Sequence, residues 1–220
     1  MGKSEGAYNN KCDMKTIQYF AKRAAAVLAI AALATLPTKA QVSQDTYYNI
    51  DWQFNIPLGN NFANDASGWG MNFEMGYYVT PELAVGGFLS YHTNNEYIKR
   101  TTLHMGSTAL NTDQQHSLFQ LPFGVLAHYR FDYGKFQPYV GMKMGATYAK
   151  MTSDYYIFES DKNTWGFFAS PEVGVQFYPW EGSMGFHAAL YYSISTNQGS
   201  LMTYELNSIN SLGFRLGIAF

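Results

Sequence analysis

The sequence predicts an all-β protein, an eight-stranded antiparallel up-and-down transmembrane β-barrel preceded by a signal peptide. Of its 220 residues, 47% are hydrophobic and 17% aromatic but only 14% are charged, and the mean hydropathy is -0.21. A bundle of membrane-spanning helices needs several apolar runs of about 20 residues, and only one segment of this chain comes close. From Tyr47 to the C-terminus, apolar and polar residues instead alternate with period two, as in the strands of a membrane barrel.

The single apolar run, residues 24–36, has the surroundings of a signal peptide. It follows Lys15, Lys22 and Arg23 and is closed by small residues that end at Ala40. A basic start, a short apolar centre and small residues at the cut predict cleavage after Ala40. A single membrane anchor is the alternative, but the run is short for a span and no stop signal follows it.

The expected domains are an upstream extension plus signal peptide over residues 1–40 and a barrel domain over residues 41–220. Met14 is a natural start for the signal, so residues 1–13 are compatible with an upstream start. The one cysteine, Cys12, lies before the apolar run, which argues against a lipid anchor and leaves the mature chain without thiol chemistry. Removing residues 1–40 gives a net charge of about −6, which disfavours a nucleic-acid partner.

Eight segments carry the alternation. In residues 118–131, for example, Phe119, Leu121 and Phe123 lie on one face, whereas Gln120 and Gly124 lie on the other. No segment shows a convincing helical period. The predicted strands are residues 46–58, 68–79, 83–95, 115–131, 136–151, 163–178, 183–195 and 207–220.

The connections between these segments alternate in length. Tight turns rich in Pro, Gly and Asp occupy residues 80–82, 132–135 and 179–182. Longer polar links are expected at residues 59–67, 96–114, 152–162 and 196–206. Short turns at one end and long loops at the other are the plan of an outer-membrane barrel, and an even strand count returns both termini to the periplasmic side.

A soluble β-sandwich also alternates and is the main alternative fold. The apolar faces, however, carry large aromatic residues at the strand ends, as interfacial girdles require. The opposite faces are rich in Gly, Ser, Ala and Gln, which suits a narrow lumen better than a water-facing sheet. The predicted girdle residues are Trp52, Trp69, Tyr77, Tyr129, Phe131 and Trp165.

The C-terminal residues resemble the C-terminal signal of bacterial outer-membrane proteins, in which the last residue is aromatic and alternate residues before it are hydrophobic. The residues that carry this predicted assembly signal are Leu212, Phe214, Leu216, Ile218 and Phe220. The resemblance implies that the barrel-assembly machinery reads this strand, which later pairs with the first strand.

The whole mature chain resembles the outer-membrane β-barrel domain family of small OmpA/OmpX-like porin-fold barrels. Its many Tyr and Gly residues and its turn at residues 79–83 are similar to the Bacteroidetes members. The resemblance implies an integral, multi-pass protein of the Gram-negative cell outer membrane, with periplasmic termini and with outer-membrane lipids and lipopolysaccharide as partners. It implies activity poorly, because one fold hosts many functions.

The parity of the alternation points six charged side chains into the lumen, which in an eight-stranded barrel is just wide enough to be filled by side chains. Charges there must pair, because an unpaired buried ion costs several kcal/mol. Counting from the strand ends, we expect two ionic clusters. The first joins Arg215 with Asp51 and Glu74, and the second joins Lys143 with Glu172.

The sixth inward charge, Arg130, is one residue from its predicted strand end, so we expect it at the periplasmic rim. An enzyme would need a base and a nucleophile within about 3 Å. The nearest candidates, His187, Ser193 and Ser195, all point inward, and the first two are about 20 Å apart along their strand. We therefore predict no catalytic residues, and no motif for a cofactor appears.

Three histidines occur in or near one predicted loop, and a metal site among them is a minor alternative. They are His92, His104 and His116. The function that these observations favour is a non-enzymatic outer-membrane barrel with a salt-bridge-plugged lumen and a structural or loop-mediated interaction role. A narrow porin for ions or small solutes is the first alternative, and a lipid-modifying enzyme is the second.

Overall fold

The computed structural model describes residues 46–220 except 60–61, 106–107, 156–157, 180–183 and 202–203. The predicted signal peptide, its cleavage after Ala40, Met14 and Cys12 therefore lie outside the described residues. Within them no helix is long and apolar enough to cross a membrane. The strands are β1 (Thr46–Leu58), β2 (Gly70–Tyr78), β3 (Leu83–Met105), β4 (Thr108–Arg130), β5 (Phe136–Tyr155), β6 (Phe158–Phe177), β7 (Gly185–Ser195), β8 (Gly199–Leu201), β9 (Tyr204–Leu206) and β10 (Ile209–Ala219).

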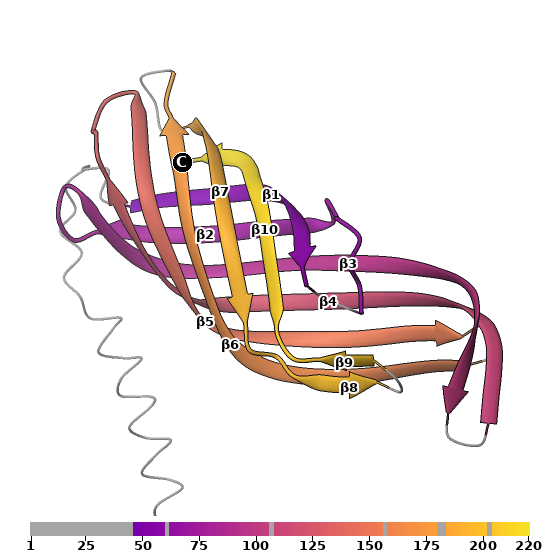
Figure 1. Cartoon of the computed structure of the whole chain (residues 1–220). Coiled ribbons are helices and arrows are strands. Elements are labelled where there is room, and N and C mark those ends of the chain that lie inside the picture. The colour runs from indigo at the N-terminus through magenta and orange to yellow at the C-terminus, as the bar shows by residue number, and fades with distance from the viewer. Residues whose placement is uncertain (1–45, 60–61, 106–107, 156–157, 180–183, 202–203) are drawn as a thin grey trace, which may run out of the picture. The chain divides into compact units, whose positions relative to one another are not determined.

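Eight of these strands close an antiparallel barrel in the order β1-β10-β7-β6-β5-β4-β3-β2, which confirms the predicted fold class (Figure 1). Each strand pairs with its sequence neighbour in the barrel, and β10 closes the ring against β1 from Asn49↔Ala219 to Leu58↔Asn210. We call the end with the turns β2–β3, β4–β5 and β6–β7 the short-turn end, and the opposite end the long-loop end. Phe220 lies at the short-turn end, where its backbone N–H donates to the carbonyl of Tyr48 at 2.8 Å.

The inward and outward faces that the alternation predicts are the ones that the structure shows. Along β1 the burial alternates strictly from Thr46 to Gln53, with Asn49, Asp51 and Gln53 buried and the residues between them exposed. Along β10 the large apolar residues from Leu212 to Ile218 point outward, while Ser211, Gly213 and Arg215 are buried. The outer wall is therefore apolar and the lumen polar, as a barrel in a bilayer requires. Every predicted girdle aromatic is exposed on that wall: Trp52, Trp69, Tyr77, Tyr129, Phe131 and Trp165.

Three of the predicted long links contain strand residues. The described residues of 96–114 and 152–162 extend barrel strands, and 196–206 contains β8 and β9, which pair as a separate hairpin. β3 and β4 pair as far as Met105↔Thr108, and β5 and β6 as far as Tyr155↔Phe158. Among the described side chains, neither face of β3 beyond residue 95 or of β6 before Thr164 is buried, and buried positions on the β4 and β5 sides, such as Gln114 and Ser153, are polar. This hides the period-two signal, while the cross-strand ladder still satisfies the backbone. In the first extension Tyr97 donates to the Asp113 carboxylate at 3.2 Å, and Arg100 pairs with the same carboxylate at 3.5 Å.

Close approach of neighbouring strands requires inward-facing glycines at specific points. A Cβ on Gly86 of β3 would lie 1.9 Å from the carbonyl oxygen of Met75 on β2, and a Cβ on Gly217 of β10 would lie 2.1 Å from that of Ile50 on β1. No side chain fits at such distances, so these glycines allow the sheet to bend tightly.

Apolar side chains fill the lumen towards the long-loop end. One buried cluster is formed by residues from the β1–β2 loop, from the hairpin β8–β9, from the start of β10, and from the parts of β4 and β5 nearer the long-loop end. Its members are Phe62, Ala63, Leu118, Ala149, Met151, Leu201, Leu206 and Ile209. We call this cluster the apolar cap. It places a hydrophobic layer between the long-loop end and the charged groups of the lumen.

Candidate functional site

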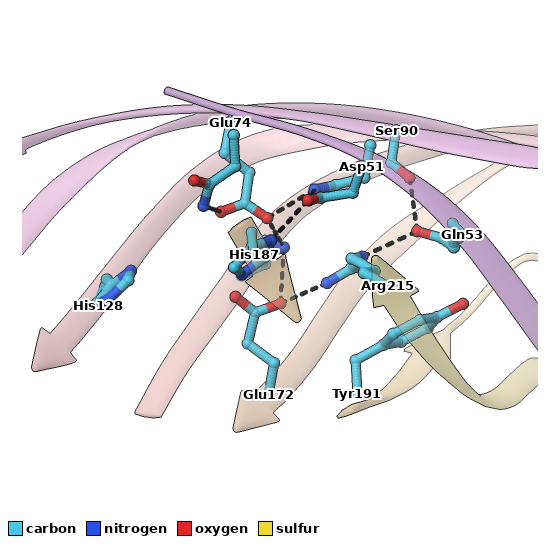
Figure 2. A network of polar contacts seen from close by, with 12 residues as sticks. Asp51, Gln53, Glu74, Ser90, His128, Glu172, His187, Tyr191 and Arg215 are labelled. Atoms are coloured by element: carbon cyan, nitrogen blue, oxygen red, sulfur yellow. Dashed lines mark hydrogen bonds and ion pairs between the residues drawn. The ribbon is translucent and has the colours of Figure 1, made fainter. Parts of the chain in front are cut away.

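The candidate site is a network of charged and polar side chains that point toward one another inside the barrel (Figure 2). Its charged members come from six strands that follow one another around the ring, from β2 through β1, β10, β7 and β6 to β5, and each lies on the inward parity of its strand. All of its charged groups are buried. They are Asp51 of β1, Glu74 of β2, Lys143 of β5, Glu172 of β6, His187 of β7 and Arg215 of β10.

The centre of the network is the Glu172 carboxylate, which accepts hydrogen bonds from two cations. Its Oε2 atom contacts Nζ of Lys143 at 2.7 Å and also pairs with a guanidinium nitrogen of Arg215. The same Lys143 Nζ pairs with Oε1 of Glu74 from the opposite side of the lumen. Two carboxylates and two cations thus form one continuous chain of ion pairs from β2 to β10.

A second chain of contacts runs through His187. Its Nδ1 atom lies 2.6 Å from Oδ1 of Asp51, and its Nε2 atom lies 2.6 Å from the hydroxyl of Tyr139. That hydroxyl also donates to Oε1 of Glu172 at 3.2 Å, so the two chains meet at Glu172. Both ring nitrogens of His187 are therefore occupied, which fixes the orientation of the imidazole.

Amide side chains link the two chains further. Nδ2 of Asn72 donates to Asp51 at 2.8 Å and to Glu74 at 2.6 Å. Nε of Arg215 donates to Oε1 of Gln53 at 3.0 Å. The Arg215 guanidinium also lies 4.0 Å from the centre of the Tyr191 ring, a cation–π contact. Arg215 is thus bonded on three sides, as a buried cation must be.

The structure brings the five predicted cluster residues into one network instead of two. The expected pair of Lys143 with Glu172 is present. The expected pairing of Arg215 with Asp51 and Glu74 is wrong, because the register places Arg215 opposite Gln53 and Asp51 opposite Gly217. Arg215 therefore reaches Glu172, and Glu74 meets Lys143 across the lumen. Sequence reasoning also missed His187 as the partner of Asp51, although its inward parity was recognised.

The comparisons with known proteins point to a membrane barrel. The sequence model of the outer membrane protein beta-barrel domain family matches residues 25–220. This chain belongs to that family. No curated protein sequence matches it at a significant level.

Among solved structures, Neisserial surface protein A is similar at 16% identity, with a TM-score of 0.51 over 80% of this chain and 96% of that one. The attachment invasion locus protein Ail of Yersinia pestis, in complex with a heparin analogue, is 13% identical, with a TM-score of 0.44 over 80% and 97%. Outer membrane protein W of E. coli is 14% identical, with a TM-score of 0.42 over 80% and 96%. The first of these likenesses supports the fold.

As a member of this family, the protein is an integral outer-membrane β-barrel, and its apolar wall is the surface that faces lipid. Salt bridges occupy its interior. The family assignment shows the compartment and the architecture, whereas the similarity to individual solved structures shows only the fold.

Arg130, the sixth inward charge of this outer-membrane barrel, lies at the short-turn end and outside the network. Its Nε donates to the carbonyl of Pro81 at 2.7 Å and its guanidinium lies 3.8 Å from the centre of the Tyr78 ring. Beside it, the hydroxyl of Tyr133 donates to the Glu82 carboxylate. That hydrogen bond lowers the pKa of Glu82 and raises the pKa of Tyr133 to about 12.

The histidines and serines considered for catalysis or metal binding are also lumen residues. Ser193 donates to the carbonyl of Ser211 at 3.4 Å, and Ser195 bonds with Asn197. His92 and His116, which lie in predicted strands beside the 96–114 link, are buried in β3 and β4. The side chain of His104 is outside the described part. Among described residues no group of three or more His, Cys, Asp or Glu side chains could hold a metal ion.

The network brings a carboxylate, an imidazole and a hydroxyl into series at Asp51, His187 and Tyr139. A catalytic arrangement of this order needs a nucleophile that a substrate can reach. The Tyr139 side chain is buried, lies between His128 and His187 at ring-centroid distances of 3.7 and 5.7 Å, and already donates to Glu172. Tyr139 is therefore not available as a nucleophile, and the side chains of the network neutralise one another's buried charges.

Proposed function

We propose that this outer-membrane barrel is a non-enzymatic protein whose lumen is plugged by salt bridges, and that it acts through structure and through the hairpins at its long-loop end. The observation that carries the proposal is the direct contact between Lys143 of β5 and both Glu74 of β2 and Glu172 of β6. These ion pairs occupy the middle of the lumen, where a conducting barrel would hold water.

The apolar cap supports the same conclusion. An ion that entered from the long-loop end would have to leave water among Phe62, Leu118 and Met151 before it met the network. The transfer of an ion into such surroundings is costly. Two successive barriers of different chemistry favour a closed barrel over the narrow porin.

The orientation follows from the plan of such barrels, in which short turns face the periplasm and long connections face outside. We infer that both ends of the barrel domain, near Thr46 and Phe220, are periplasmic. The extended hairpins β3–β4 and β5–β6 would then project from the cell, where they are available to a partner and lie next to lipopolysaccharide.

The last strand supports a role in assembly. Leu212, Phe214, Leu216, Ile218 and Phe220 form the outward face of β10 and its end, and β10 closes the ring against β1. We infer that the barrel-assembly machinery reads this face before closure.

Planar-bilayer conductance of the purified, refolded protein tests the plug. We expect no stable single-channel steps from the wild type, because the charged network and the cap close the lumen. A variant that combines Glu74→Ala, Lys143→Ala and Glu172→Ala with Leu118→Ala and Met151→Ala removes the central pairs and opens the cap, and it should give measurable openings. Lys150→Ala, which removes a half-exposed pair with Asp161, should stay silent. Steady conductance of the wild type would reject the plug and favour the narrow porin.

The enzymatic alternative has its own test. Lipid A from cells with and without the gene is compared by mass spectrometry. The proposal expects identical spectra, because the described hydroxyl–histidine pairs, such as Ser153 with His116 at 3.2 Å, are buried in the lumen and do not face lipid. A mass difference that the wild-type gene restores would overturn the non-enzymatic assignment.

A further inference from the structure

A groove of about 550 Å³ runs over the outer wall of the barrel where β1, β2, β3 and β4 lie side by side. Its surface is almost entirely apolar. Gly87 of β3 forms part of its floor, and the outward side chains around it are Tyr48, Ile50, Phe73, Met75, Leu89 and Phe123.

The groove exists because residue 87 has no side chain, and the fold does not require a glycine there. A Cβ on Gly86 would collide with the Met75 carbonyl oxygen at 1.9 Å, so that glycine is structural. A Cβ on Gly87 would meet only the Gly124 carbonyl oxygen, at an ordinary 3.6 Å. Gly59 is the only described glycine with positive φ, so the backbone of Gly87 is open to other residues. A strand glycine without a structural reason often marks the close approach of a ligand.

The position of the groove indicates what it meets. Gly87 is four residues beyond Leu83, where β3 begins at the short-turn end, or about 13 Å along the strand. The hydrocarbon core of a bilayer is about 30 Å thick. The groove therefore lies in the half of the membrane nearest the short turns, which the proposed orientation makes the phospholipid leaflet.

We propose that this groove binds one acyl chain of a phospholipid from the periplasmic leaflet. A chain lying over Gly87 is contacted from the floor and from both sides, so it gains more dispersion contacts than a chain on the flat wall. A second barrel is the weaker occupant, because protein interfaces in membranes depend on small residues that allow close approach. Here the rim of the groove consists of large side chains.

The test is photolabelling in vesicles of phosphatidylethanolamine that contain a trace of the same lipid with a diazirine in mid-chain. Labelled residues are mapped by mass spectrometry. In the wild type, we expect several-fold more label around Met75 and Leu89 than around Val140, an outward residue of β5 that lies outside the groove and, like Gly87, four residues from the start of its strand at the short-turn end. The variant Gly87→Phe fills the groove and should reduce that excess to the level of the general wall.

The matched control is Val140→Phe, which adds an aromatic ring to the lipid-facing wall at the same distance from the short-turn end but outside the groove, and it should leave the labelling at Met75 unchanged. Heat-modifiable gel mobility shows that each variant is folded. Equal labelling of groove and wall, or no effect of Gly87→Phe, would overturn the proposal. Displacement of the label by lipopolysaccharide would overturn the phospholipid assignment, and efficient disulfide dimers of Phe73→Cys would assign the groove to a second copy.

The assignment of the groove to the periplasmic leaflet rests on the proposed orientation of the barrel, but the groove does not depend on the salt-bridge plug of the lumen. Conductance is therefore recorded from the same preparations. A conducting wild type with labelled groove residues would reject the plug alone, whereas a silent wild type with uniform label would reject the groove alone.

Discussion

Asp51 of β1 and His187 of β7 are joined across the lumen at 2.6 Å, although 136 residues separate them in the sequence and β10 lies between their strands. Backbone pairing connects β1 only to β10 and β2. The side-chain contact therefore ties together strands that the ladder leaves unconnected. The chain from Lys143 to Glu74 does the same for β5 and β2. The network thus braces the barrel internally.

We expect Lys143→Met to destabilise the barrel by about 3–5 kcal/mol, the cost of leaving a buried charge without its partner. Glu172 keeps Arg215, but Glu74 loses its ion pair. Urea unfolding in lipid vesicles measures the change. The control is Lys150→Met, whose pair with Asp161 is 3.7 Å long and half-exposed, and which should cost less than about 1 kcal/mol.

Adding Glu74→Gln to Lys143→Met should recover a large part of that loss, because the double variant leaves no unpaired carboxylate at position 74. The two changes would then be strongly non-additive in the same unfolding experiment. Additive losses would mean that Lys143 and Glu74 do not interact in the folded barrel.

The adjacent glycines of β3 should respond differently to alanine. Gly86→Ala places a Cβ against the Met75 carbonyl and should lower the unfolding free energy by more than about 2 kcal/mol. Gly87→Ala meets no such obstacle and should be neutral or slightly stabilising, because it reduces the freedom of the unfolded chain. Equal effects would contradict the close approach of β2 and β3.

The register of β10 is open to site-directed labelling. Leu216 is 48% exposed on the wall, and Ser211 is 1% exposed and faces the lumen. Nitroxide labels on single cysteines should be relaxed by oxygen dissolved in lipid at position 216 but not at position 211. Because a slip of one residue would exchange the two faces, the opposite accessibility would refute the register.

The C-terminal aromatic residue should matter more for insertion than for the finished barrel. Phe220 adds only the backbone pair with Tyr48, at 2.8 and 3.1 Å, and its side chain faces outward. Phe220→Asp should therefore strongly reduce heat-modifiable, membrane-inserted protein in cells. The same variant refolded in detergent should form a barrel of nearly normal stability, and Phe220→Tyr should insert normally. Normal insertion of the aspartate variant would refute the assembly signal.

The contact between Tyr133 and Glu82 in neighbouring turns should be visible in a pH titration. The hydrogen bond to the carboxylate raises the pKa of Tyr133 to about 12 and lowers that of Glu82. The stabilisation by Tyr133 is complete below the ordinary tyrosine pKa of about 10 and is lost as the pH rises through 12. The stabilisation by Glu82 is complete above a pH of about 4.3, the ordinary glutamate pKa, and is lost as the pH falls through its lowered pKa.

The absorbance of ionised tyrosine, taken as the difference between wild type and Tyr133→Phe, isolates this one group. In Glu82→Gln the titration of Tyr133 should move down towards its ordinary range, because the charged acceptor is gone. An unchanged midpoint would show that the two turns are not in contact.

The period-two pattern alone determined which residues face lipid and which face the lumen, as Asp51 and Leu216 illustrate. The reason is that a strand has only two faces and that a slip of one residue inverts both. The same pattern failed beyond residues 95 and 151. There β3 and the start of β6 have no buried face among the described side chains, and buried positions of β4 and β5, such as Gln114 and Ser153, are polar, so that hydrophobic alternation carries no signal.

The partners of the lumenal charges were decided by the tertiary structure. Arg215 lies opposite Gln53 in the register and reaches Glu172 two strands away, and Lys143 reaches Glu74 across the lumen. Strand order and residue counts do not determine these partners, because the partners depend on the shear of the closed barrel and on the length of each side chain. The groove at Gly87 has the same origin. Alternation places Gly87 on the outer face and Gly86 on the inner one, but only the packed structure shows that a Cβ would collide at Gly86 and meet no obstacle at Gly87.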